Sequence, residues 1–145
     1  MSKITQKGLI GAWLLEDYFI EDNEGNREYP LGENAQGIIM YTPDGYMSAQ
    51  LMTPDRPEFA VNNMHKGQPD EYAKAAGGYH AYSGRFEFDE EKQELRHFMD
   101  ISLFPNYVGD SQVREARVVG DILYVSNPKF NNQLVWRRAK DNSGN

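Results

Sequence analysis

The 145-residue chain contains no cysteine, which excludes disulfide bonds, thiolate nucleophiles and cysteine-ligated metal sites. It also has no apolar run that approaches the roughly 20 residues of a membrane-spanning helix, so no membrane partner is expected. Acidic side chains dominate, with 22 Asp and Glu against 15 Lys and Arg and a formal net charge of −7. Because no stripe of basic residues occurs, a nucleic-acid partner is also disfavoured.

Targeting, metal and cofactor motifs are missing as well. The segment MSKITQKGLIGAW lacks the apolar region and cleavage site of a signal peptide, so we expect a cytoplasmic protein. The histidines, His65, His80 and His97, form no HxH or HExxH pattern, and His65 and His80 flank a predicted helix rather than a cavity. No glycine-rich phosphate loop or nucleophile elbow is present. We therefore expect neither a metal nor a cofactor.

What the sequence does contain is alternation with a period of two, which places every second side chain on one face of a strand. Within residues 79–104, two strands are expected around a charged turn at residues 89–93. Their apolar faces hold Tyr82, Phe86 and Phe88 on the first strand, and Leu95, His97, Met99 and Ile101 on the second. His97 is therefore expected to face the core.

Further strands are expected at residues 9–21, 37–41, 46–52, 112–119, 121–126 and 132–139, with a short pairing segment at 27–29. In the first strand, alternation puts Trp13, Leu15, Asp17 and Phe19 on one face and Leu14, Glu16, Tyr18 and Ile20 on the other. Thr42–Gly45 reads as a Pro-Asp-Gly hairpin turn. A helix is expected from about Pro69 to Ala76, and because it is short it must pack on another element.

These elements predict a single all-β domain over residues 1–145, with a core at 9–139 and a polar tail at 140–145. About eight to ten short, mostly sequential strands with one helix favour an antiparallel meander, either a barrel or a sandwich. A barrel of about eight strands can hold one small ligand.

Several motifs extend this prediction. Gly11-Ala12-Trp13 opens the first strand, Trp136-Arg137-Arg138 ends the last, and GIIMYTPDGYMSAQL, YSGRF and SLFPNYVGDSQVR lie between them. With these stretches the chain resembles the bacterial and fungal lipocalin-like domain family. The resemblance implies an antiparallel calycin-type barrel with an inner cavity, and an arginine near the end that packs on Trp13. It implies no single chemistry.

Six residues are candidates for a ligand site: His97, Tyr82, Arg114, Met99, Phe86 and Gly84. His97 could orient a ligand or act as a general base, or it could be a core histidine hydrogen-bonded to a backbone or tyrosine group, and Tyr82 could pair with it inside the barrel. Gly84 could leave room for a ligand or mark a strand bend. Arg114 needs an anionic ligand or an acid partner, for which Asp17 is the candidate. Met40, Met47, Met52 and Met99 with Leu51 could line an apolar pocket or fill the core.

Three functions remain open from sequence. The first is a barrel that binds a small, mainly apolar or amphipathic molecule in an interior cavity of some hundreds of Å³. The second is a small isomerase or cyclase of secondary metabolism that uses His97, Tyr82 and Arg114. The third is a purely structural barrel that self-associates, for example as a homodimer.

Overall fold

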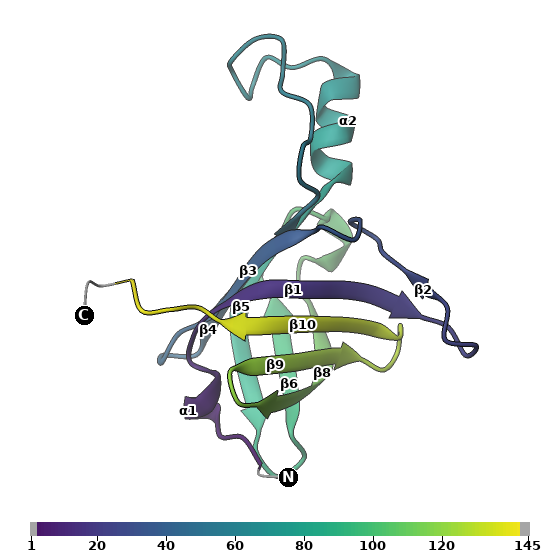
Figure 1. The fold of residues 1–145 in the computed structure, drawn as a ribbon. Coiled ribbons are helices and arrows are strands. Elements are labelled where there is room, and N and C mark those ends of the chain that lie inside the picture. The colour runs from purple at the N-terminus through teal and green to yellow at the C-terminus, as the bar shows by residue number, and fades with distance from the viewer. Residues whose placement is uncertain (1–2, 143–145) are drawn as a thin grey trace.

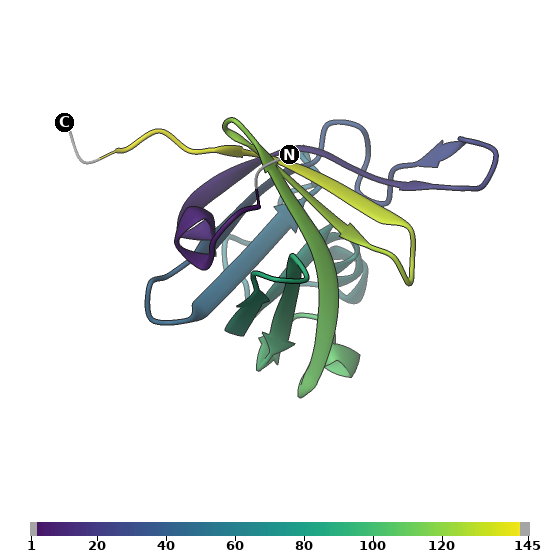
Figure 2. The same cartoon turned by 90° about the horizontal axis from the view of Figure 1, so that it is seen from below.

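The structure is a computed structural model that describes residues 3–142. Ten strands form one antiparallel sheet: β1 (Gly11–Glu21), β2 (Arg27–Glu28), β3 (Gln36–Tyr41), β4 (Tyr46–Met52), β5 (Tyr79–Asp89), β6 (Glu94–Met99), β7 (Ile101–Ser102), β8 (Asp110–Val119), β9 (Ile122–Asn127) and β10 (Asn132–Arg138). Eight of them close into a barrel because β10 pairs with both β9 and β1. Figures 1 and 2 show the sheet curling until its first and last long strands meet. The predicted all-β barrel is confirmed.

The hairpin of β3 and β4 forms as predicted. Its turn closes with Gly45 at a φ of 93°, a left-handed conformation that favours glycine. The second arm of the long hairpin differs from the prediction, because β6 stops at Met99 and the short β7 pairs with the early part of β5. The chain changes direction at Asp100, whose backbone N–H donates to the Ser83 carbonyl. Ile101 is consequently 67% exposed, so its predicted place on the core face is wrong.

Strand β1 contains an irregularity that simple alternation missed. Its register with β10 shifts between Leu15 and Asp17, as in a β-bulge. The extra residue reverses the faces beyond it. Tyr18 therefore lines the barrel interior, whereas Phe19 packs beside Tyr29 and under the Arg27 guanidinium. The predicted faces of the second half of this strand were thus exchanged.

One end of the barrel is closed by α1 (Gln6–Leu9), a short helix that the sequence analysis did not predict. Leu9 is buried, and its carbonyl accepts a hydrogen bond from the Trp13 indole at 3.0 Å. The Arg138 guanidinium lies 4.0 Å from the centre of the Trp13 ring and donates to the carbonyls of Gly8 and Ile10. The predicted arginine–tryptophan stack is confirmed, and it ties α1 to the last strand.

Helix α2 (Pro69–Gly77) confirms the predicted helix. No residue of α2 is buried, and Figure 1 shows the helix and the loop before it projecting from the end of the barrel opposite α1. The helix packs on that loop, through an edge contact between Tyr72 and Phe59 at 5.3 Å and a hydrogen bond from Ala60 N–H to Glu71. Within residues 3–142, no helix is long and apolar enough to cross a bilayer.

Candidate functional site

The barrel interior contains a buried chain of polar side chains from three strands. His97 on β6 is 1% exposed, and its Nδ1 lies 3.1 Å from the hydroxyl of Tyr82 on β5. This confirms the predicted Tyr82–His97 pair. On its other side, His97 Nε2 lies 2.8 Å from the hydroxyl of Tyr41 on β3. Sequence reasoning missed Tyr41, because β3 and β6 are not neighbours in the sheet.

The direction of these hydrogen bonds follows from burial. Desolvation, assisted by the Arg114 charge, holds the pKa of His97 well below its ordinary value, so the imidazole is neutral and has one donor and one acceptor. Burial raises the pKa of Tyr41 well above its ordinary value, so Tyr41 keeps its proton. Since His97 is its hydrogen-bond partner, we assign Tyr41 as donor to Nε2. His97 then donates from Nδ1 to Tyr82, which leaves the Tyr82 proton available to a further acceptor.

Arg114 on β8 faces the same interior and is 7% exposed. Its Nη2 donates to Gln112 Oε1, whereas Nη1 is buried without a hydrogen-bond partner. Among residues 3–142, the salt bridges join other pairs, and neither Asp17 nor another carboxylate pairs with Arg114. The predicted Asp17 salt bridge is therefore wrong. The β1 bulge between Leu15 and Asp17 explains this, because it changes which side chains of this part of the strand point into the barrel.

A small interior cavity of about 40 Å³ adjoins these side chains. Its lining comes from eight strands: Tyr18, Ile39, Ala49, Leu51, His80, Tyr82, His97, Arg114, Val125, Asn132, Leu134 and Trp136. In the part of the chain that the structure describes, three buried side-chain polar atoms lack a partner: Arg114 Nη1, Asn132 Oδ1 and Trp136 Nε1. All three residues line this cavity.

This cavity is much smaller than the interior cavity of some hundreds of Å³ that was expected from the sequence. Whole ligands of drug size occupy pockets of roughly 300 Å³ or more. The barrel's own side chains fill most of the interior, including Trp13, Trp136 and Leu123, which are all at most 1% exposed. A space of about 40 Å³ holds a few water molecules or the polar end of a larger molecule.

The predicted position of His80, beside the helix and away from the cavity, is wrong. It follows α2 at the start of β5 and lines the cavity, where its ring lies 5.2 Å from that of Tyr82 and 5.8 Å from that of Tyr107. Burial, with a smaller effect from Arg114, lowers the pKa of His80. Alternation alone could have found it, because His80 and Tyr82 are two residues apart on one strand.

Comparison with known proteins agrees with this architecture, since residues 10–140 match the family described as "Lipocalin-like domain". The chain belongs to this lipocalin-like domain family. One relative is the "4'-hydroxy-3'-methoxypropiophenone carrier protein ppsC" of Aspergillus oryzae (strain ATCC 42149 / RIB 40). It is 35% identical over 86 residues, which span 55% of this chain and 78% of the relative.

Two crystal structures are more distantly similar to this lipocalin-like barrel. One is a duf4847 family protein from Bacteroides vulgatus ATCC 8482, with 10% identity, a TM-score of 0.47, and coverage of 92% of this chain and 96% of that protein. The other is a mutant of the fluorescent protein UnaG, with 11% identity, a TM-score of 0.42, and coverage of 94% and 100%.

The remaining predicted site residues lie in the walls of the lipocalin-like barrel. Phe86 and Met99 are buried in the core, and the Phe86 ring packs edge-on against Tyr41 at 4.9 Å. Phe86 therefore packs against the tyrosine–histidine chain, and the contact of Phe86 and Met99 with a ligand stays a prediction. A Cβ on Gly84 would lie 1.9 Å from the Phe98 carbonyl oxygen. The room that a ligand was expected to use at Gly84 is thus occupied by backbone, which supports the alternative of a strand bend.

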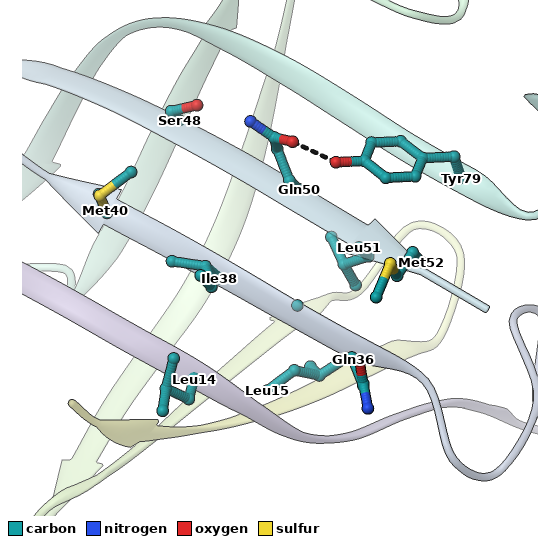
Figure 3. A pocket seen from close by; sticks show the side chains of 11 residues that line it. Leu14, Leu15, Gln36, Ile38, Met40, Ser48, Gln50, Leu51, Met52 and Tyr79 are labelled. Carbon is teal, nitrogen blue, oxygen red and sulfur yellow. Dashed lines mark hydrogen bonds between the residues drawn. The ribbon is translucent and has the colours of Figure 1, made fainter. Parts of the chain in front are cut away.

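A second concavity, which we call the outer groove, crosses the outside of β1, β3, β4 and β5 (Figure 3). It measures about 470 Å³ and is lined by Leu14, Leu15, Gln36, Gly37, Ile38, Met40, Ser48, Gln50, Leu51, Met52 and Tyr79. Of its polar side chains, Tyr79 and Gln50 share a hydrogen bond, Ser48 bonds to Ser83, and Gln36 is exposed. The predicted methionine pocket is therefore divided: Met40 and Met52 line the outer groove, and Met47 and Met99 belong to the core.

Proposed function

We propose that this lipocalin-like barrel is a binding or carrier protein that holds the polar end of a small organic molecule in the interior cavity. One observation carries the proposal: three buried polar atoms without partners, on Arg114, Asn132 and Trp136, belong to residues around the same cavity. Leaving a buried polar group unpaired costs roughly 1–3 kcal/mol, so a site that receives a partner for all three is favoured. The outer groove is larger, but none of the buried unpartnered side-chain atoms of residues 3–142 belongs to a residue that lines it.

The relative's name supports the same class of function. The Aspergillus oryzae protein is described as a carrier of 4'-hydroxy-3'-methoxypropiophenone, an aromatic ketone with a phenol group. A ligand of this kind is amphipathic, with polar oxygens on an apolar ring. The cavity receives the polar end, and the ring rests at the mouth, where Tyr18, His80 and Leu134 are only half-buried.

Binding is favoured over catalysis by the state of His97. Both of its ring nitrogens are engaged by tyrosine hydroxyls, so neither is available to take a proton from a substrate. The imidazole is better suited to fixing the orientation of Tyr82. The homodimer and the cytoplasmic location stay predictions, and sedimentation velocity at two protein concentrations measures the first directly.

The two tryptophans provide a test with an internal control. The Trp13 indole N–H is bonded to the Leu9 carbonyl, whereas that of Trp136 is unpartnered beside the cavity. In a ¹H–¹⁵N spectrum, the protein is titrated with 4'-hydroxy-3'-methoxypropiophenone and with a panel of simple phenols, aryl ketones and aryl carboxylates. We expect at least one compound to move the Trp136 indole signal saturably and to leave the Trp13 signal in place. Trp136→Phe assigns the two signals.

Substitutions in the two concavities locate the site. Leu134→Trp should fill the cavity mouth and abolish the shift, whereas Met40→Glu in the outer groove should leave it unchanged. A saturable shift that survives Leu134→Trp but is lost with Met40→Glu would move the site to the outer groove. If no compound of the panel moves the Trp136 signal at millimolar concentration, the proposed function is wrong.

A further inference from the structure

The charge inside the barrel points to a more specific ligand than the proposed function requires. Arg114 is 7% exposed and carries a guanidinium that no carboxylate of residues 3–142 neutralises. An unpaired charge in such a place is unfavourable, and a partner of opposite sign offsets that cost. A ligand of opposite charge therefore stabilises Arg114 more than it would stabilise a neutral polar residue in the same place.

The groups that face Arg114 do not supply that partner. His80 and His97 both have lowered pKa values, because burial and the Arg114 charge disfavour their protonated forms. Tyr18 and Tyr82 have raised pKa values because of burial, so both phenols are neutral. At neutral pH these neighbours contribute no charge, and the cavity carries the positive charge of Arg114 alone among its lining residues.

Hydrogen-bond donors add to this positive character. Arg114 Nη1 and Trp136 Nε1 are unpartnered donors, and the hydrogen-bond direction assigned above gives Tyr82 a third available proton. Asn132 Oδ1 is the single unpartnered acceptor among the buried side-chain atoms of residues 3–142. Three donors against one acceptor suit an oxyanion that also carries one hydrogen-bond donor.

The volume of the cavity also suits a small anionic group. A cavity needs about 10–15 Å³ to hold one water molecule, so about 40 Å³ accommodates a group of about three non-hydrogen atoms. A carboxylate has three such atoms. A planar anion of this size can also accept two parallel hydrogen bonds from donors such as a guanidinium.

We propose that the ligand is a small organic anion whose carboxylate enters the cavity and pairs with Arg114, with Tyr82 and Trp136 as further donors. This inference rests on the proposed function and adds the ligand's charge to it. It also gives the tyrosine–histidine chain a role, because Tyr41 and His97 together set the direction in which the Tyr82 hydroxyl donates.

The test compares 4-hydroxy-3-methoxybenzoate with 4-hydroxy-3-methoxybenzamide, which share a ring and differ in charge. Dissociation constants come from the Trp136 indole signal and from calorimetry. We expect the carboxylate to bind at least tenfold more tightly at pH 7.5. Arg114→Gln should remove this preference, Arg114→Lys should restore part of it, and Arg117→Gln should leave it intact. Arg117 is a matched control because it lies on the same strand but outside, over the Tyr124 ring.

Each result decides between the two proposals. Equal binding of the carboxylate and the amide overturns the anion inference and leaves the binding function standing. Binding of 4'-hydroxy-3'-methoxypropiophenone without binding of the carboxylate does the same. A preference that persists in Arg114→Gln also overturns it, because the charge then acts elsewhere. If no compound binds, the proposed function fails and the inference fails with it.

Discussion

The Tyr41 hydroxyl lies 2.8 Å from His97 Nε2, although the two residues are 56 positions apart and sit on strands that do not pair. Both side chains are at most 2% exposed. The contact therefore crosses the barrel interior and links two walls through a polar bond. It also sets the hydrogen-bond direction of Tyr82, and with it the donors that the cavity presents.

Removing the Tyr41 hydroxyl should destabilise the fold. Tyr41→Phe leaves His97 Nε2 buried without a partner, which we expect to lower the free energy of unfolding by about 1–3 kcal/mol. Urea denaturation followed by circular dichroism measures the change. Tyr46→Phe is the control, because Tyr46 is 52% exposed, and its effect should stay within about 0.5 kcal/mol. Equal effects of the two substitutions would contradict a buried bond to His97.

Stability should fall with pH below about 6.5, the ordinary histidine pKa that applies to the unfolded chain. The folded pKa of His97 is held well below that value, by burial first and by Arg114 second. Between the two pKa values the unfolded chain binds more protons, so acidification favours unfolding by up to about 1.4 kcal/mol per pH unit for one histidine. His80, whose pKa is also lowered, adds to the slope.

Urea titrations at pH 7.5, 6.5 and 5.5 measure this slope above the range where carboxylates titrate, which is near pH 4. His97→Gln should flatten it more than His80→Gln, because His97 is 1% exposed and His80 is only half-buried. An unchanged slope in His97→Gln would mean that His97 is not the group that resists protonation.

Two glycines allow a matched test of backbone packing. A Cβ on Gly84 would collide with the Phe98 carbonyl oxygen at 1.9 Å, whereas a Cβ on Gly77 in α2 meets nothing within 4 Å. Gly84→Ala should cost at least about 2 kcal/mol, because β5 and β6 must separate. Gly77→Ala should be neutral or stabilise by up to about 1 kcal/mol, since alanine favours a helix. Thermal unfolding of both variants checks the pair, and a tolerated Gly84→Ala would disprove the close approach of the strands.

Arg114 should lower the stability of the ligand-free protein. Replacing it by methionine removes an unpaired charge while retaining much of its volume, so we expect the free energy of unfolding of ligand-free Arg114→Met to equal the wild-type value or to exceed it by up to about 2 kcal/mol. Arg117→Met, on the outer face, should change stability by less than about 0.5 kcal/mol. Denaturation of the ligand-free proteins measures both. A loss of more than about 1 kcal/mol in Arg114→Met would show that existing contacts already compensate the charge.

The sequence by itself determined which side chains face inward over most strands. Alternation put Tyr82 and His97 on one face of one hairpin, and turn residues marked its ends, because side-chain direction and turn geometry are local properties of the backbone. The arginine and tryptophan motifs at the two ends of the chain likewise predicted that an arginine near the end packs on Trp13, and the structure shows that it is Arg138.

Tertiary structure alone decided how those faces meet. The bulge in β1 exchanged Tyr18 and Phe19, the pairing of β10 with β1 closed the barrel, and Tyr41 reached His97 across the interior. The absence of an acid beside Arg114 among the described residues, and the cavity of about 40 Å³, were equally invisible in sequence. A period of two gives the face of a residue, but the register between distant strands and the summed volume of interior side chains depend on the closed barrel as a whole.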